Sequence, residues 1–239
     1  MNKKILIAWA AAALLAPHAQ ADEAEIRAKL PQRLPDIPKI EDVRPAAIPG
    51  LYEVAVSGGE VLYSDEHGEY IIHGDLIQTK TMRNLTEERQ AKLTQIDFNS
   101  LPLQDAVVWK VGTGKRRMAI FADPNCGYCK RLERDLQQLK DVTVYTFLIP
   151  ILGGDSPQKA QNIWCSKSAM QTYRDWMLDG VAPPRFMGMT CNTPLERNLS
   201  LARKLRVEAT PALFFENGSR IRGAASVAEI EKRLSGSKS

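Results

Sequence analysis

Histidine is scarce in this sequence of 239 residues, and the C-terminal two thirds of the chain contains none. The three histidines are His18, His67 and His73. Their positions exclude histidine-based catalysis, and a metal site built from several histidines, in everything that follows residue 73. Nucleophilic or redox chemistry in that part of the chain must therefore rely on the four cysteines.

The sequence also lacks a large net charge. Lys and Arg number 32 and Asp and Glu 28, so the formal charge is +4, of which Lys3 and Lys4 contribute two. The rest of the chain has no basic footprint of the size that nucleic-acid binding requires, so we expect no nucleic-acid partner. Apolar residues at 44% and charged residues at 25% are typical of a chain that folds and buries a core.

Long hydrophobic runs are missing as well. The longest covers residues 5–16, and its 12 residues are fewer than the ~20 that cross a bilayer as a helix. Lys3 and Lys4 precede this run and Ala19-Gln20-Ala21 follows it, which is the pattern of a secretory signal peptide. We predict cleavage after Ala21 and a location outside the cytosol, where disulfides persist; a membrane anchor is the alternative.

Residues 22–78 contain no cysteine and are typical of a small α+β module. A short amphipathic segment, Glu23 to Leu30, precedes several short strand-like runs separated by turn residues, which favours antiparallel hairpins. About 57 residues bury too little surface to be stable alone, so the sequence predicts that this module pairs with a second copy in a homodimer. The expected strands are Leu51–Val56, Glu60–Ser64, Tyr70–His73 and Asp75–Gln78.

Residues 79–100 are predicted to form a helical linker. Asn84 is a suitable N-cap with Glu87 three residues later, and residues 85–97 are rich in strong helix formers. The alternative is an ordinary helix packed within a single domain, with Leu85, Ile96 and Phe98 buried.

Residues 101–239 alternate between strand-like and helix-like segments, which indicates an α/β domain. A capping box at Thr193-Pro194-Leu195-Glu196 predicts one helix start, and Asn217-Gly218 predicts a hairpin turn. The expected strands are Ala106–Val111, Met118–Ala122, Val142–Leu148, Ala212–Phe215 and Ser219–Arg222, and the expected helices begin at Cys126, Ser156, Pro194 and Ser226.

The sequence Cys126-Gly127-Tyr128-Cys129 opens the first of these helices. Disulfide exchange requires a thiolate, and the free N–H groups and positive dipole end of a helix start favour the thiolate of Cys126. We expect Cys126 to be the accessible nucleophile and Cys129, one helical turn further on, to be the inward resolving thiol. Cys129, Leu132, Leu136 and Leu139 are expected on the buried face, with Lys130, Arg131, Glu133, Arg134 and Asp135 opposite, where Lys130 and Arg131 add to the positive field.

The other two cysteines, Cys165 and Cys191, are separated by 25 residues and have no histidine nearby. A pair so far apart does not complete a zinc site with the CxxC motif, so we expect neither a metal nor another cofactor. With Cys126 and Cys129 paired as the redox couple, the remaining pairing is Cys165 with Cys191. We predict a structural disulfide there; a second redox pair is the alternative.

The order of elements, with CxxC at the start of the first main helix and Thr210-Pro211 before a hairpin, resembles the thioredoxin fold. The whole chain after Ala21 resembles the DsbC/DsbG group of periplasmic disulfide isomerases. Its Gly-Tyr dipeptide between the cysteines is similar to DsbC, whereas DsbG has Pro-Tyr. The resemblance implies a thioredoxin-like catalytic domain with a helical insertion at 101–239, a dimerisation module at 22–78 and a helical linker between them.

The resemblance also implies how the site binds its substrate. The bond before Pro211 would be cis, the loop would lie against the CxxC motif, and the Thr210 backbone would pair with an extended client chain. Gly127 and Tyr128 would be further substrate contacts. The implied activity is thiol-disulfide isomerase or reductase in the periplasm, with misfolded or mis-oxidised secreted proteins as clients and a reducing, DsbD-like membrane protein as electron donor. The alternatives are a client-binding chaperone with secondary thiol chemistry and a dithiol oxidase.

Overall fold

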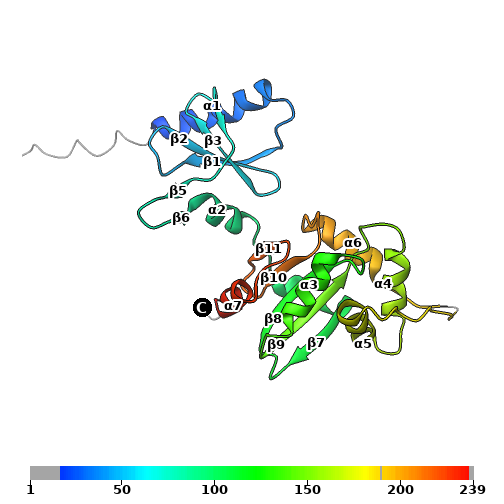
Figure 1. Cartoon of the computed structure of the whole chain (residues 1–239). Helices are drawn as coiled ribbons and strands as arrows, with labels where there is room; N and C mark the ends of the chain where they lie inside the picture. The colour runs from blue at the N-terminus through cyan, green and yellow to red at the C-terminus, as the bar shows by residue number, and fades with distance from the viewer. Residues whose placement is uncertain (1–16, 189, 237–239) are drawn as a thin grey trace, which may run out of the picture. The chain divides into compact units, whose positions relative to one another are not determined.

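The computed structural model describes residues 17–188 and 190–236, and the chain forms two compact units that divide between Thr94 and Gln95 (Figure 1). The predicted signal peptide falls mostly outside the described residues, because only its residues 17–21 are described, at the beginning of the first helix. No helix in the described part of the chain is long and apolar enough to span a membrane.

The first unit packs one helix on an antiparallel sheet. Ile26 and Leu30, four residues apart on α1, are both buried against the strands, which confirms the amphipathic helix expected here. The sheet order is β1-β2-β3-β4. The elements are α1 (Pro17–Arg33), β1 (Ile40–Pro45), β2 (Leu51–Val56), β3 (Glu60–Asp65) and β4 (Ile71–Ile72).

The hairpins expected in this unit are present, but the first and last strands differ from the prediction. β2 has the predicted bounds, but the last two expected strands shrink to β4 and to β5 (Ile77–Gln78), of two residues each. β1 and β6 (Arg83–Asn84) were not predicted. Neither segment alternates cleanly between apolar and polar residues, so its pairing is set by the neighbouring strand rather than by its own pattern.

The predicted linker, residues 79–100, contains one helix and one short helical turn. α2 (Leu85–Leu93) begins as expected, with the Asn84 side chain accepting the Glu87 N–H at 3.0 Å, but it ends at Leu93 rather than Asp97. The chain then passes into the second unit, where the Ile96 N–H donates to the Gly218 carbonyl at 3.1 Å. Phe98 is buried in the short helix η1 (Phe98–Ser100).

The second unit is built on a five-stranded sheet of order β11-β10-β8-β9-β7, in which β8 and β9 are parallel and the other neighbours antiparallel. The predicted order of strands and helices is confirmed. The strands are β7 (Val107–Val111), β8 (Arg116–Ala122), β9 (Val142–Leu148), β10 (Ala212–Phe215) and β11 (Arg220–Arg222). The helices after η2 (Leu103–Asp105) are α3 (Gly127–Leu136), α4 (Ser156–Trp164), α5 (Ala169–Arg174), η3 (Asp175–Asp179), α6 (Leu195–Lys204) and α7 (Val227–Ser235).

The central strand β8 separates two apolar cores, because successive side chains of a strand point to opposite faces. Ile120 and Ala122 contribute to the core that holds Cys126, Cys129 and the buried side of α3. The intervening Phe121 contributes to the other core, where it stacks on Phe147 and meets Phe214 edge-on. The carboxyl end of β8, at Ala122, leads through a short loop to the start of α3 at Gly127.

The predicted capping box before α6 is not formed. Pro194 occupies the N-cap position and no side chain caps the helix, because the helix begins at Leu195, one residue later than expected. Thr193 therefore lies outside the helix and its hydroxyl is not at the cap. Further along α6, the buried Asn198 donates its Nδ2 to the carbonyls of Asp105 (3.1 Å) and Leu148 (3.3 Å), which ties the helix to the sheet.

Candidate active site

The loop between β8 and α3 is fixed by a fully buried carboxylate. Asp123 accepts hydrogen bonds from the N–H of Asn125 (2.7 Å), the N–H of Leu152 (2.9 Å) and the hydroxyl of Ser156 (2.7 Å). Its carbonyl also accepts the N–H of Cys126 at 3.0 Å. Four bonds on one residue hold the backbone of the first cysteine in place before the helix begins.

Cys126 occupies the N-cap position of α3, where the sequence places it. Its Sγ accepts the N–H of Cys129 at 3.2 Å and donates to the Thr210 carbonyl at 3.3 Å. The Thr210-Pro211 bond is cis. A thiolate at Cys126 keeps the bond from the helix N–H and gives up the bond to Thr210, so the carbonyl becomes available to another donor.

The two thiols differ less in exposure than expected. Cys126 is 4% exposed and Cys129 1%, so the expectation of an open Cys126 is wrong: residue 126 is buried beside Thr210. Gly127 and Tyr128 are the exposed residues of the motif, Tyr128 at 63%. Burial, followed by the hydrogen bond to Cys126, raises the pKa of the Cys129 thiol well above its usual range.

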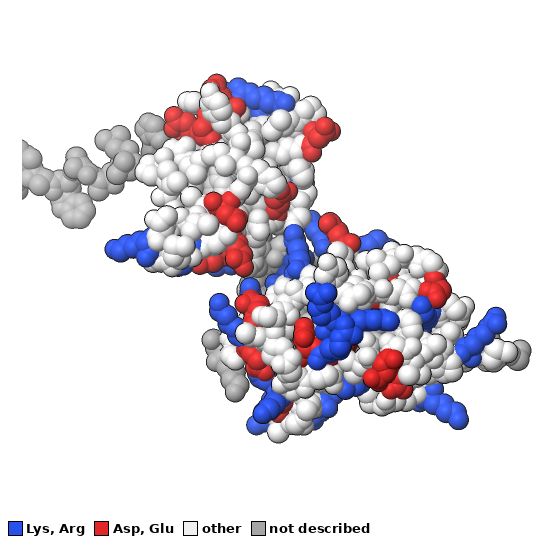
Figure 2. Space-filling view, in the orientation of Figure 1, with Lys and Arg blue, Asp and Glu red and all other residues white. Residues whose placement is uncertain are grey.

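Cations of α3 and α4 lie over aromatic rings. Lys130 Nζ lies 3.6 Å and Lys159 Nζ 4.4 Å from the centre of the Trp176 ring, and Arg131 lies 5.5 Å from the centre of the Tyr128 ring. Burial and the Lys159 charge lower the pKa of Lys130. Figure 2 shows Lys and Arg side chains gathered over α3 on the visible face of this unit. These cations therefore stack on aromatic rings, and the expected contribution of Lys130 and Arg131 to the field at Cys126 stays a prediction.

Trp176 also anchors the loop that carries the first cysteine. Its Nε1–H donates to the Pro124 carbonyl at 2.6 Å, two residues before Cys126. No local pattern marks Trp176 as a site residue, because it is 52 positions away in sequence from the group it contacts. The role of Asp123 could have been predicted from the sequence, because an Asp side chain often accepts the backbone N–H two residues later in an Asx turn.

Glu133 was assigned to the wrong face of α3. It is 1% exposed, and its Oε1 accepts the Tyr173 hydroxyl at 2.9 Å. Among the described residues its Oε2 has no hydrogen-bond partner. The helical period could have placed it, because Cys129, Leu132, Glu133 and Leu136 stand at i, i+3, i+4 and i+7 of one buried stripe.

The burial of Glu133 predicts an unusual dependence of stability on pH. Burial raises the pKa of Glu133 to about 7, although Tyr173 and Arg174 act in the opposite direction. Between pH 4.5 and 7 the folded chain holds a proton that the unfolded chain has released, so stability falls as pH rises through this window. We expect Glu133→Gln, which keeps the acceptor for Tyr173, to remove a penalty of about 3 kcal/mol at pH 8 and to flatten this slope.

Urea denaturation of the wild type and Glu133→Gln at pH 5, 6, 7 and 8, followed by circular dichroism, measures the difference. The exposed Glu88, which pairs with Arg83, provides a matched control as Glu88→Gln. Equal pH slopes for the wild type and Glu133→Gln would show that the buried carboxyl titrates normally.

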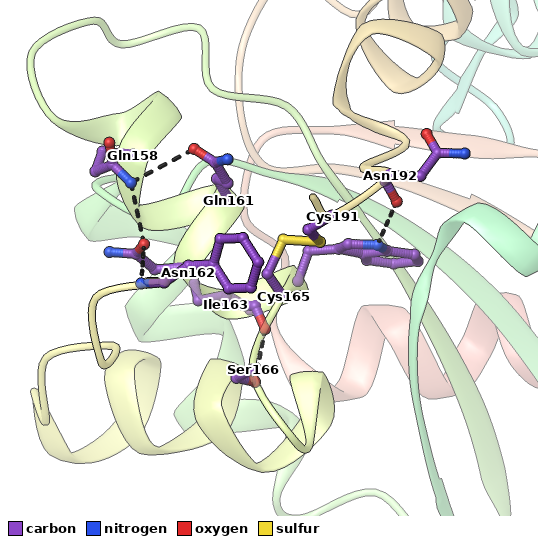
Figure 3. The surroundings of a disulfide bond; sticks show 10 residues. Gln158, Gln161, Asn162, Ile163, Cys165, Ser166, Cys191 and Asn192 are labelled. Carbon is purple, nitrogen blue, oxygen red and sulfur yellow. Dashed lines mark hydrogen bonds between the residues drawn. A yellow bond between two sulfur atoms is a disulfide. The ribbon is translucent and has the colours of Figure 1, made fainter. Parts of the chain in front are cut away.

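The disulfide of this unit joins Cys165, the C-cap of α4, to Cys191, with the two Cα atoms 6.0 Å apart (Figure 3). This is the predicted pairing, and Cys126 and Cys129 are both free thiols. Next to the bond, the Trp164 Nε1–H donates to the Asn192 carbonyl at 3.3 Å. Trp164 is thus partly buried beside the disulfide, as expected for a packing residue.

Across residues 17–188 and 190–236, no group of three or more His, Cys, Asp or Glu side chains is placed to hold a metal ion.

Two family models match the chain, one for each unit. The disulfide bond isomerase protein N-terminal domain matches residues 17–87, and a thioredoxin-like domain matches residues 103–237.

The chain is also similar to individual proteins that are named thiol:disulfide interchange proteins. The chain is 46% identical over 185 residues to the probable thiol:disulfide interchange protein DsbC of Bordetella parapertussis, covering 77% of this chain but only 65% of that protein. The Bordetella avium protein of that name is 41% identical, over 87% of this chain and 73% of its own length. DsbC of Escherichia coli is 27% identical, over 97% and 95%. A disulfide interchange protein from Neisseria gonorrhoeae superposes with a TM-score of 0.53 at 34% identity, covering 58% of this chain and 99% of that structure.

Proposed function

Because this chain belongs to the DsbC family of thiol:disulfide interchange proteins, we propose that it is a thiol-disulfide isomerase and reductase. The observation that carries the proposal is the setting of Cys126. Its sulfur lies at the N-cap of α3, accepts the Cys129 N–H and touches the Thr210 carbonyl. A sulfur that lies between a helix start and a backbone carbonyl, which the thiolate form leaves available, suits attack on a disulfide in an extended chain.

In the first step the Cys126 thiolate attacks one sulfur of a wrong disulfide in a client. A new S–S bond forms between Cys126 and that sulfur, the client S–S bond breaks, and the other client sulfur leaves as a thiolate. Thr210 supplies a carbonyl next to this centre, and Gly127 and Tyr128 supply exposed surface. We assign these three residues and Pro211 to client binding.

The mixed disulfide then has two fates. A thiolate elsewhere in the client attacks it and releases Cys126 unchanged, which is isomerisation with no net electron transfer. Alternatively, Cys129 attacks, the Cys126–Cys129 disulfide forms, and the client leaves reduced by two electrons. Burial raises the pKa of Cys129, and the thiolate is the attacking form, so the second fate is slow. Slow resolution favours isomerisation.

The remaining assignments follow from this chemistry. A chain that reduces some clients accumulates the Cys126–Cys129 disulfide, so it requires a dithiol donor, which we assign to a reducing membrane protein of the DsbD type. Its clients are misfolded or mis-oxidised secreted proteins. These assignments place the protein in the periplasm, in agreement with the leader-like residues 1–21.

Refolding of scrambled ribonuclease tests the proposal against its alternatives. We expect the reduced protein to restore ribonuclease activity and to reduce insulin more slowly. Suppression of client aggregation without repair would instead indicate a chaperone with secondary thiol chemistry. Rapid oxidation of a reduced client peptide by the Cys126–Cys129 disulfide form, without repair, would indicate a dithiol oxidase.

The first unit gives a separate prediction about assembly. Its four-stranded sheet, with α1 packed on it, is a small, cysteine-free module, which favours pairing of two copies. We expect sedimentation velocity at micromolar concentration to give a homodimer. A chain shortened to residues 95–239 should be a monomer that still reduces insulin but no longer repairs scrambled ribonuclease. A full-length monomer would refute the assembly while leaving the thiol chemistry intact.

A further inference from the structure

The residues from Asp123 to Cys126 form a β-turn that joins β8 to α3. The Cys126 N–H closes the turn on the Asp123 carbonyl at 3.0 Å. Pro124 occupies the second position, where its fixed φ suits a turn, and the φ of Asn125 in the third position is negative, as in a type I turn. The position of the Cys126 sulfur therefore depends on the conformation of this turn.

The middle peptide of the turn, between Pro124 and Asn125, is held at both of its polar atoms. Its N–H donates to the Asp123 carboxylate at 2.7 Å. Its carbonyl points the other way and accepts the Trp176 Nε1–H at 2.6 Å. Because Pro124 is a buried residue, its carbonyl has little access to water, and the indole supplies its hydrogen bond.

The ring of Trp176 is itself fixed by two cations. Lys130 Nζ, from the helix that carries the cysteines, lies 3.6 Å from the centre of the ring, and Lys159 Nζ, from α4, lies 4.4 Å from it. Lys159 Nζ also donates to the Asn125 side chain at 2.8 Å. Trp176 thus connects the turn to α3 and to α4, and the ring does not rotate away from Pro124 without loss of both cation contacts.

Without the bond to Trp176, the middle peptide is free to turn over. The flipped peptide gives a type II turn, which requires a positive φ in the third position, and asparagine tolerates that conformation better than most residues. The flip also withdraws the Asn125 N–H from Asp123. A turn that exchanges between the two forms does not keep the Cys126 Sγ aligned with the Cys129 N–H, which lies 3.2 Å away.

We propose that Trp176 is a positioning residue for Cys126, because it fixes the turn and so keeps the sulfur at the helix N–H that favours its thiolate. This inference rests on the proposed function. In the Cys126–Cys129 disulfide the covalent bond itself holds the sulfur, so the contact with Trp176 matters only for the reduced form. Its removal should therefore shift the cysteine pair toward the disulfide.

The equilibrium of the cysteine pair with glutathione tests this inference. One glutathione disulfide oxidises Cys126 and Cys129 to their disulfide and leaves as two glutathione thiols. The full-length protein is equilibrated at pH 7 with defined glutathione ratios, quenched with acid, alkylated and digested, and the peptide that contains both cysteines is quantified by mass spectrometry. Trp176→Phe keeps a ring for the lysines but removes the N–H donor. It should raise the equilibrium constant for oxidation about tenfold, the effect of one hydrogen bond.

The rate of the first exchange step is a second readout. A peptide carries its single cysteine as a mixed disulfide with thionitrobenzoate. Attack by Cys126 of the reduced protein joins Cys126 to the peptide sulfur and releases thionitrobenzoate as a coloured thiolate. We expect Trp176→Phe to lower this second-order rate constant about threefold at pH 7, because fewer molecules hold an aligned thiolate. A wild type that releases no thionitrobenzoate would contradict the proposed function, and this inference with it.

Trp164→Phe is the matched control for this substitution. It makes the same change in the same unit, where the Trp164 Nε1–H donates to the Asn192 carbonyl at 3.3 Å. It should lower the stability measured in urea by a similar amount but shift the glutathione equilibrium by less than about twofold. An unchanged equilibrium constant in Trp176→Phe, or equal shifts in the two variants, would overturn the proposal while leaving the thiol chemistry intact.

Asn125→Gly tests the turn with Trp176 in place. Glycine removes the bond from Lys159 and admits the flipped turn, so the equilibrium constant should rise as it does in Trp176→Phe. If Trp176→Phe does not fold, an unchanged constant in Asn125→Gly equally refutes the proposal.

Discussion

Cys126→Ser should abolish the repair of scrambled ribonuclease, reducing it to the rate measured without protein. A hydroxyl does not attack a disulfide sulfur at neutral pH, so no mixed disulfide with the client forms. The fold should survive, since serine at the N-cap still accepts the N–H that Cys126 accepts from Cys129. Loss of activity with an unchanged circular dichroism spectrum therefore assigns the nucleophile.

Cys129→Ser separates the two thiols. The first exchange still occurs in this variant, but resolution by residue 129 is removed, so mixed disulfides with the client accumulate. Non-reducing gel electrophoresis detects them as adducts that disappear with dithiothreitol. Insulin reduction should fall much more than ribonuclease repair, because only reduction requires the second thiol. If Cys126→Ser retained repair or Cys129→Ser formed no adducts, the assignment of the two roles would be wrong.

The start of α3 shows which structural features a local sequence pattern can predict. A cysteine pair followed by apolar residues at helical spacing is enough to place Cys126 at the N-cap and to bury Leu132 and Leu136. The same spacing buries Glu133, which was missed because a carboxyl side chain was assumed to face water. At this position the period of the helix outweighs the polarity of the residue, at the cost of an altered pKa.

The contacts that complete the site depend on residues far apart in the chain. The Thr210 carbonyl meets a sulfur 84 positions earlier, and only the resemblance to a known family predicted that approach. Trp176 donates to the Pro124 carbonyl across 52 positions, and no motif in the sequence analysis predicted that contact. Local propensities do not encode such pairs, because the sheet and its covering helices determine them. The same limit explains β1, whose register comes from β2.

Replacing Cys165 and Cys191 together by alanine should lower the free energy of unfolding by about 3 to 4 kcal/mol, the loop entropy that a closed loop of this length carries. The described residues from Gly180 to Pro194 form neither helix nor strand, and α6 begins after them without a side-chain cap. The disulfide, the bond from Trp164 to Asn192 and the bond from the Phe186 N–H to the Asn162 side chain (3.0 Å) hold this segment to α4.

The double variant also decides between the two roles considered for this pair. Urea denaturation should give the lower stability, while the rate of thionitrobenzoate release by Cys126 should stay within about twofold of the wild type, because the disulfide touches neither thiol of α3. Trp164→Phe, which removes the bond to Asn192 and trims the packed ring while keeping the disulfide, is the control and should cost about 1 kcal/mol. A double variant that is as stable as the wild type but unable to exchange disulfides would instead make Cys165 and Cys191 a second redox pair, because removal of a structural disulfide lowers the free energy of unfolding.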